Sequence, residues 1–297
     1  MPQIINGDIS FAITSEESLT NVDTELLYST RDLALETIAY DGIAVFLAFG
    51  YNVGEQRLLA SLNGQISIEQ LRQLYTGQIT NWKQLGGADL PVKLYIPDNR
   101  EVVDIFETKV LQNPLDIDVF RSLLKTDSGD NSEAEAITQE DELNNPQINR
   151  LPVYQMLRSI LREFEDDQVA SIGFAPISKI FGQCAVYPLA ISSNGENGVQ
   201  PFIQDNGQAI DINLDLCKAK GNYQPNSVVF QQQTYPLTYP LKVIYPLDNN
   251  LPPAGQKFAE ILKTQEIQTA MAKTGLIPLV EDEQRLGVRG QGSEVRG

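Results

Sequence analysis

The chain contains no histidine among its 297 residues. Histidine is the commonest general base and metal ligand in proteins, so its absence excludes a Ser-His-Asp triad and a His-ligated zinc site. Two cysteines are too few for a zinc cage. An enzyme would need carboxylates, lysine or tyrosine, and no paired acids stand at the end of an expected strand. We therefore expect no catalytic residue, no metal site and no cofactor.

Basic residues are scarce, since 22 Lys and Arg stand against 39 Asp and Glu, which gives a net charge of -17. Such a surface repels phosphate backbones, so we expect no nucleic-acid partner. No apolar run approaches the roughly 20 residues that span a bilayer. The longest run, at 41–49, has the length of a strand, so we expect no membrane span. The opening MPQIINGDISFAIT lacks the basic-then-apolar pattern of a signal peptide, and we expect none in this chain.

The clearest local pattern is ISIEQLRQLYTGQITNWKQLGG at 66–87. Ser67 is expected to cap a helix, with Gln70 at the capping-box spacing. The apolar residues that follow share one helix face: Ile68, Leu71, Leu74 and Tyr75. Gly77 is expected to end the helix in the left-handed conformation. We interpret Trp82 as a packing residue and not as a ligand platform.

Strands and helices alternate along most of the chain, which favours α/β architecture with largely parallel sheets. Residues 33–49 are expected to form two extended segments broken at Asp41-Gly42. Residues 235–247 are expected to be extended and are punctuated by three prolines. The other expected strands are at 9–14, 91–96 and 169–175, and the main helices at 101–112, 153–164, 252–263 and 264–275.

Residues 125–150 are acidic, polar and poor in aromatics, so we expect a long exposed loop insertion there. A cation site is the sharper interpretation of its carboxylates, but their spacing matches no EF-hand loop. Residues 281–297 are expected to form a disordered tail.

Cys184 and Cys217 leave two interpretations open. In a cytosolic protein they would be two buried thiols. In an exported protein they would form a disulfide that closes a loop rich in Gly, Asn and Gln, worth roughly 3–4 kcal/mol in the chain-entropy model.

The order of several motifs resembles the phosphate-binding proteins of ABC transporters, which are type II periplasmic binding proteins. These motifs are DGIAV, the helix-YTGQITNW-GG module, a strand-turn-helix, ASIGFAPIS and YPLTYPLKVIY. The resemblance extends over most of residues 6–280. It is strongest to the cyanobacterial branch, where a GQC strand and a later cysteine also occur.

The resemblance implies a two-lobed type II periplasmic-binding-protein fold with mostly parallel sheets and a ligand between the lobes. Lobe one would comprise residues 1–44 and 238–297, and lobe two residues 45–237. Residues 41–49 and 235–247 would be the two crossovers. Both cysteines would then lie in lobe two, which favours the disulfide.

The resemblance also implies a missing element, because MPQIING matches only the end of the family's first helix. The first strand of lobe one, and the ligand loop that follows it, would be absent. An interior strand cannot be lost without leaving backbone groups to be paired by other means. Either the sequence begins downstream of the true start, or another segment completes lobe one, or its sheet is rearranged.

Four residues match the family's ligand positions. Thr14 and Ser15 preserve the hydroxyls of the lobe-one loop, and Asn99 and Arg100 stand at the turn that opens a lobe-two helix. Such hydroxyl and arginine donors suit an oxyanion. The structural alternatives are a helix cap at Thr14-Ser15 and an exposed helix-start arginine.

The same two stretches depart from the family pattern. Glu16-Glu17 stand where Arg-Pro is common, and Arg100, Glu101 and Val102 stand where a Gly-Ser-Gly-Thr-like turn is expected. Lost donors and added negative charge predict weak or absent phosphate binding, because each such contact is worth roughly 1.5–3 kcal/mol.

Two functions therefore compete. The first is a solute-binding domain for phosphate or another small anion, located in the periplasm or elsewhere outside the cytoplasm and served by an ABC permease. The second is a sensor or protein-interaction domain that kept the fold, lost phosphate binding and acts with a signalling partner.

Overall fold

The computed structural model describes seven stretches of the chain: residues 10–15, 32–48, 58–125, 147–167, 170–193, 197–247 and 253–279. The expected tail at 281–297 and most of the expected loop at 125–150 lie outside them. Within these stretches no helix has the length and apolar character needed to cross a bilayer.

The strands follow one another along the chain with short helices between many of them. Their bounds are β1 (Ala12–Ser15), β2 (Leu33–Ala48), β3 (Gln65–Ser67), β4 (Lys93–Pro97), β5 (Gln147–Leu151), β6 (Ser171–Pro176), β7 (Val186–Pro188), β8 (Ala190–Ser192), β9 (Phe202–Gln204), β10 (Tyr223–Pro225) and β11 (Thr238–Pro246).

The helices include several of only one or two turns. Their bounds are α4 (Ile68–Tyr75), the 3₁₀-helix η2 (Trp82–Leu85), α5 (Arg100–Phe106), the π-helical η3 (Glu107–Leu111), α6 (Pro114–Lys125), α8 (Val153–Asp167), α9 (Ile177–Ile180), α10 (Ser227–Gln231), α11 (Ala254–Leu262) and α12 (Gln265–Lys273).

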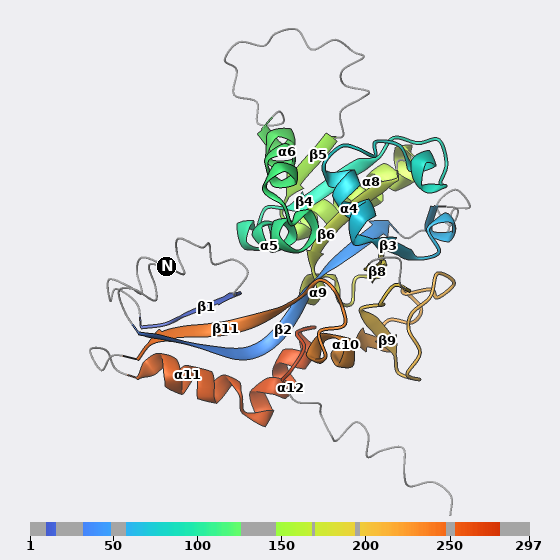
Figure 1. Ribbon diagram of the computed structural model, residues 1–297. Coiled ribbons are helices and arrows are strands. Elements are labelled where there is room, and N and C mark those ends of the chain that lie inside the picture. Colours follow the sequence, from blue (N-terminus) through green and yellow to red (C-terminus); the bar gives the residue numbers. More distant parts are fainter. Residues whose placement is uncertain are drawn as a thin grey trace, which may run out of the picture.

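One sheet connects two halves of the molecule, with the strand order β1-β11-β2-β6-β4-β5. We call β1, β11 and residues 33–42 of β2, with α11 and α12, the small half. The remainder, with β4, β5, β6 and residues 43–48 of β2, is the large half. Figure 1 shows α11 and α12 beneath the strands of the small half, and α4, α5, α6 and α8 around the strands of the large half.

The α/β class is confirmed, but the described sheet is mixed and not mostly parallel. β4 pairs parallel with β5 and β6, whereas β2 pairs antiparallel with β6, β7 and β11. The reason lies in the connection between the halves. β2 leaves the small half and β11 returns to it, so these two neighbours must run in opposite directions.

The expected break at Asp41-Gly42 is wrong, because β2 is one continuous strand of 16 residues. Its pairing partner changes there instead. Residues 33–42 pair with β11, and from Ile43 onward β2 pairs with β6 and then β7. The two expected crossovers lie side by side where they meet: Asp41 and Gly42 pair with Tyr239 and Thr238, and the Ile43 N–H donates to the Leu237 carbonyl at 3.0 Å. The rest of β11 pairs with residues 33–40.

A third correction concerns residues 147–150, which were expected to belong to the acidic loop. They form most of β5, an edge strand whose Ile148 is buried. The polar sequence QINRL carries little strand signal by itself, and the parallel pairing with β4 supplies the backbone hydrogen bonds that order it.

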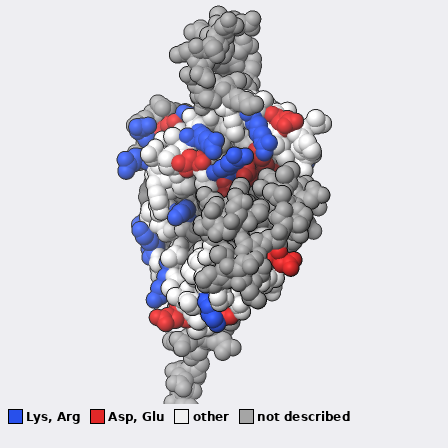
Figure 2. Space-filling model, turned by 90° about the vertical axis from the view of Figure 1, so that its left-hand side faces the viewer, with Lys and Arg blue, Asp and Glu red and all other residues white. Residues whose placement is uncertain are grey.

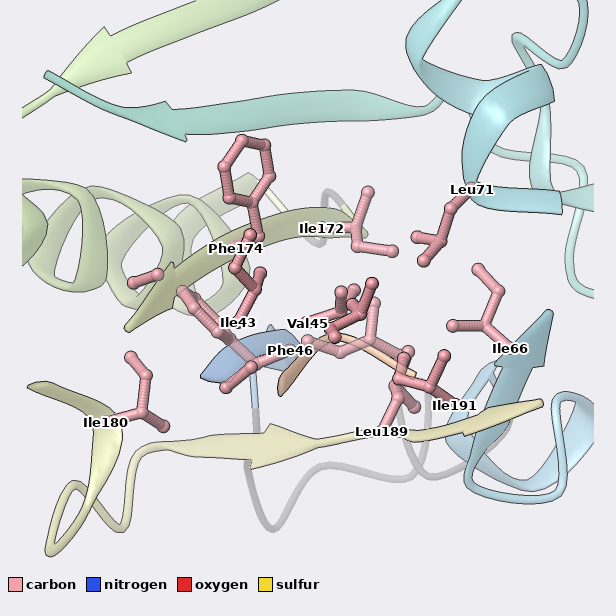
Figure 3. Close-up of a cluster of buried hydrophobic side chains, with 14 of the residues drawn as sticks. Ile43, Val45, Phe46, Ile66, Leu71, Ile172, Phe174, Ile180, Leu189 and Ile191 are labelled. Atoms are coloured by element: carbon pink, nitrogen blue, oxygen red, sulfur yellow. The ribbon is translucent and has the colours of Figure 1, made fainter. Parts of the chain in front are cut away.

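The large half contains the main hydrophobic core. Figure 3 shows side chains from β2, β6, β3, β8, α4 and α9 that point toward one another, among them Phe46, Phe174 and Ile191. The alternating residues of β2 beyond Gly42 are buried on both faces, as in a central strand covered by helices. The core of the small half is much smaller in the described residues and comprises Ile38, Val243, Tyr245 and Ala259.

The pattern at 66–87 folds as expected. Ser67 Oγ accepts from the Gln70 N–H at 3.0 Å, and Gln70 Oε1 accepts from the Ser67 N–H at 2.9 Å, which completes the capping box. Gly77 has a φ of 74°. Trp82 is fully buried, and its indole N–H donates to the Ala170 carbonyl at 2.7 Å. This module is therefore a packing unit of the large half.

Candidate functional site

The first two predicted ligand residues lie at the end of β1, the edge strand of the small half. β1 pairs with β11, which places Thr14 opposite Lys242 and Ser15 opposite Leu241. Ser15 is fully buried and Thr14 is 7% exposed. Two hydroxyl residues buried at a strand end need hydrogen-bond partners within the protein, or a ligand that provides them.

The other two predicted residues lie where β4 leads into α5 in the large half. Asn99 is the N-cap of α5, and its Oδ1 accepts from the backbone N–H of Glu101 at 2.9 Å. The Arg100 side chain is 84% exposed, and its Nε lies 3.8 Å from Asp104 Oδ2. Asn99 is therefore engaged in ordering the helix start, and Arg100 extends into solvent with an acidic neighbour on its own helix.

Glu101 is the residue that connects the two stretches. Its Oε1 accepts from the Ser15 N–H at 2.8 Å and from Ser15 Oγ at 3.1 Å, and Thr14 Oγ1 lies 3.5 Å from the same atom. Thr14 Oγ1 is closer to the Ser15 carbonyl, at 3.1 Å. Because a hydroxyl has one proton, the two bonds from Ser15 are the firm ones and Thr14 is at the distance limit.

The structure thus brings Thr14 and Ser15 to Glu101 and leaves Arg100 outside this cluster. The sequence drew attention to Glu101 as an added negative charge, but it did not predict this contact. The two partners are 86 residues apart in the chain. Sequence spacing within one helix or strand cannot predict a contact between residues so far apart in the chain.

A buried carboxylate marks the point where β2 passes from one half to the other. Asp41 is 3% exposed. Its Oδ1 accepts from the N–H groups of Gly42 at 2.7 Å and Ser178 at 3.2 Å, and its Oδ2 accepts from Ser178 Oγ at 2.6 Å. Burial raises the pKa of Asp41 to about 6, although these hydrogen bonds oppose the shift. Asp41 thereby ties the junction of β2 to α9 of the large half.

The two cysteines lie in the large half and are joined by a disulfide, with a distance of 4.7 Å between the Cα atoms of Cys184 and Cys217. In the stretches that the structure describes, no three Cys, Asp or Glu side chains gather in a way that could hold a metal ion. The cation site considered for residues 125–150 falls mainly outside those stretches.

Charges of both signs occur on the side of the molecule that carries β1 and α5. Figure 2 shows Lys and Arg side chains beside Asp and Glu in the upper part of this face, which belongs to the large half. Cations are therefore exposed here despite the net charge of -17.

Comparison with known proteins adds the family context. A family model described as a PBP superfamily domain matches residues 1–265.

Solved structures with this fold come from several bacteria. A candidate phosphate ABC transporter substrate-binding protein with bound phosphate, from Clostridium perfringens, is 20% identical with a TM-score of 0.54, over 94% of this chain and 83% of that one. An ABC-type phosphate transport receptor from Vibrio cholerae is 18% identical with a TM-score of 0.56, over 93% and 82%. At these identities the likeness is one of fold.

Proposed function

The chain belongs to the PBP superfamily, and from this premise we propose that it is a solute-binding domain with a degenerate site for phosphate or a related oxyanion. We further propose that it binds a solute and catalyses no reaction, because solved structures that share its fold are described as a substrate-binding protein and a transport receptor. The proposed site lies between Thr14-Ser15 and the Asn99–Glu101 turn. Solved structures with the same fold include one described with bound phosphate.

One observation carries the proposal: the donors of Ser15 already hold an oxyanion group. A main-chain N–H and a hydroxyl of the small half converge on one carboxylate oxygen from the large half, at 2.8 and 3.1 Å. Amide and hydroxyl donors aimed at one charged oxygen are what a phosphate oxygen requires. The donors of Ser15 and the acceptor of Glu101 lie on opposite sides of the junction between the halves. A closing solute-binding protein holds its ligand at such a junction.

The same observation explains why the site is degenerate. Glu101 takes up the donors that phosphate would need, and its charge repels a second anion nearby. Arg100 extends into solvent and adds no contact to the cluster. Micromolar affinity corresponds to about 8 kcal/mol, and the loss of several contacts of roughly 1.5–3 kcal/mol each removes it.

The second candidate function is a sensor or protein-interaction domain derived from this fold. The contact of Glu101 with Ser15 favours it, because side chains of the protein itself join the halves there. In that case a partner protein would recognise the joined form. An ABC permease is the expected partner of the first function and a signalling protein that of the second.

For location, we propose a compartment outside the cytoplasm, such as the periplasm. The disulfide between Cys184 and Cys217 supports this, because disulfides persist in oxidising compartments and are rare in the reducing cytosol.

Calorimetric titration of the protein with phosphate, arsenate and sulfate tests the proposal. We expect dissociation constants weaker than about 1 mM, since most of the binding energy is lost. A Ser15→Ala variant is the matched control, and it should weaken any residual binding further. Sub-micromolar affinity for phosphate would show that the site is not degenerate. Residual binding that Ser15→Ala leaves unchanged would show that the ligand binds elsewhere.

A further inference from the structure

We infer that the Glu101 carboxylate is a built-in ligand, which occupies the Ser15 donors in place of an external anion and keeps the two halves joined. The inference rests on the proposed function for the nature of those donors. It goes further by assigning Glu101 two effects: exclusion of oxyanions, and retention of the joined state in their absence.

The geometry is that of a bound anion and not of a surface contact. Ser15 is fully buried, and its N–H and Oγ both approach the same oxygen of Glu101. A carboxylate that accepts two bonds on one oxygen is held in a fixed position. A free anion would need to displace it before it could reach these donors.

The backbone around Glu101 holds its side chain toward the small half. Glu101 is the second residue of α5, and Asn99 Oδ1 accepts from its N–H at 2.9 Å. The same N–H is thereby engaged within the turn. Asn99 thus positions Glu101, and Glu101 in turn accepts the hydrogen bonds from Ser15.

The contact also joins two elements, β1 and α5, that belong to different halves of the molecule. β1 belongs to the sheet of the small half and pairs with β11, while α5 packs on β4 in the large half. Covalent continuity between the halves runs through β2 and β11. Ser15 pairs with Leu241 of β11 beside this connection. Its bond to Glu101 therefore adds a link between the halves and restricts rotation about β2 and β11, as a ligand does between two hinged lobes.

The test compares Glu101→Ala with Glu101→Gln. Alanine removes the acceptor and the charge, whereas glutamine keeps an acceptor oxygen and removes only the charge. Glu69→Ala is the matched control, because Glu69 is exposed and interacts with Arg72 and Gln73 of its own helix. The fluorescence of Trp82, the one tryptophan of the chain, verifies that each variant is folded.

Two measurements are made on each variant: amide hydrogen exchange at Ser15, and calorimetric titration with inorganic phosphate. In Glu101→Ala we expect exchange at Ser15 to be faster by about ten-fold, the factor that matches one net hydrogen bond. We expect phosphate affinity to rise by a similar factor or more. Glu101→Gln should show a smaller rise in exchange, and Glu69→Ala should match the wild type in both.

The outcomes separate this inference from the proposed function. Faster exchange together with gained phosphate affinity supports both. Faster exchange without any gain supports Glu101 as the bond between the halves, but refutes oxyanion binding at these donors. Unchanged exchange at Ser15 in a folded Glu101→Ala protein overturns the inference, whatever phosphate does. If the alanine variant does not fold, Glu101→Gln decides by the same criteria.

Discussion

Asp41 offers the sharpest test of how the junction is built, through the substitution Asp41→Asn. The carboxylate is buried at the point where β2 changes pairing partners, and burial raises its pKa from 3.8 to about 6. Asparagine keeps an acceptor oxygen for the N–H groups of Gly42 and Ser178, and its Nδ2 can donate to Ser178 Oγ. The variant therefore removes the titration and retains the contacts, with the direction of the bond to Ser178 Oγ reversed.

The sign follows from proton linkage. Between the unfolded pKa and the folded one, the native state binds more protons at Asp41 than the unfolded state, so stability falls as the pH rises. The contribution of protonated Asp41 is complete below pH 3.8 and is lost as the pH passes through about 6. A shift of about two units corresponds to about 3 kcal/mol, of which about 2 kcal/mol falls between pH 4.5 and pH 7.

Urea unfolding of both proteins, followed by Trp82 fluorescence, measures this quantity. The free energy of unfolding of Asp41→Asn, relative to wild type, should rise by about 2 kcal/mol from pH 4.5 to pH 7. The comparison cancels the other titrating carboxylates, and Glu266→Gln, at an exposed carboxylate, serves as the control substitution. A difference between Asp41→Asn and wild type that stays constant across this range would refute the reasoning.

Three further changes should each have a defined effect. Gly42→Ala should destabilise the protein by about 1–3 kcal/mol in urea unfolding, since a Cβ there would lie 2.7 Å from the Phe230 ring. A loss of stability below the error of the fit would contradict this close packing. A thiol assay on unreduced, denatured protein should find no free thiol, and two titratable thiols would contradict the disulfide. Reduction of Cys184–Cys217 should lower the free energy of unfolding by roughly 3–4 kcal/mol. Trp82→Phe should cost about 1–3 kcal/mol, measured by thermal unfolding, because it removes the indole N–H donor from the Ala170 carbonyl and leaves space in the core. An unchanged unfolding temperature would show that water replaces the bond.

The parts of the fold that were predicted correctly depend on contacts close in sequence. The capping box of Ser67 and Gln70 spans three residues, and Gly77 takes its left-handed conformation at the end of the same helix. The interpretation of Trp82 as a packing residue is also confirmed by its burial, although its indole N–H bonds to Ala170, 88 residues away. The order of the motifs along the chain indicated the family, and the match to the PBP superfamily confirms it.

The errors arose where distant partners decide the local structure. Asp41-Gly42 is typical of a turn, yet the strand continues, because Ser178 satisfies the Asp41 carboxylate and β11 and β6 supply pairing on either side. Residues 147–150 were predicted to be loop because their sequence is polar, but backbone pairing with β4 stabilises them as a strand.

The sequence by itself determined the class of fold, the capped helix of the 66–87 module and the exclusion of histidine chemistry, since each follows from residue types or from neighbours within one helical turn. Only the tertiary structure decided that Glu101 reaches Ser15 and that β2 runs unbroken through the junction. The physical reason is that a hydrogen bond between residues 86 positions apart forms only after both halves have folded and met.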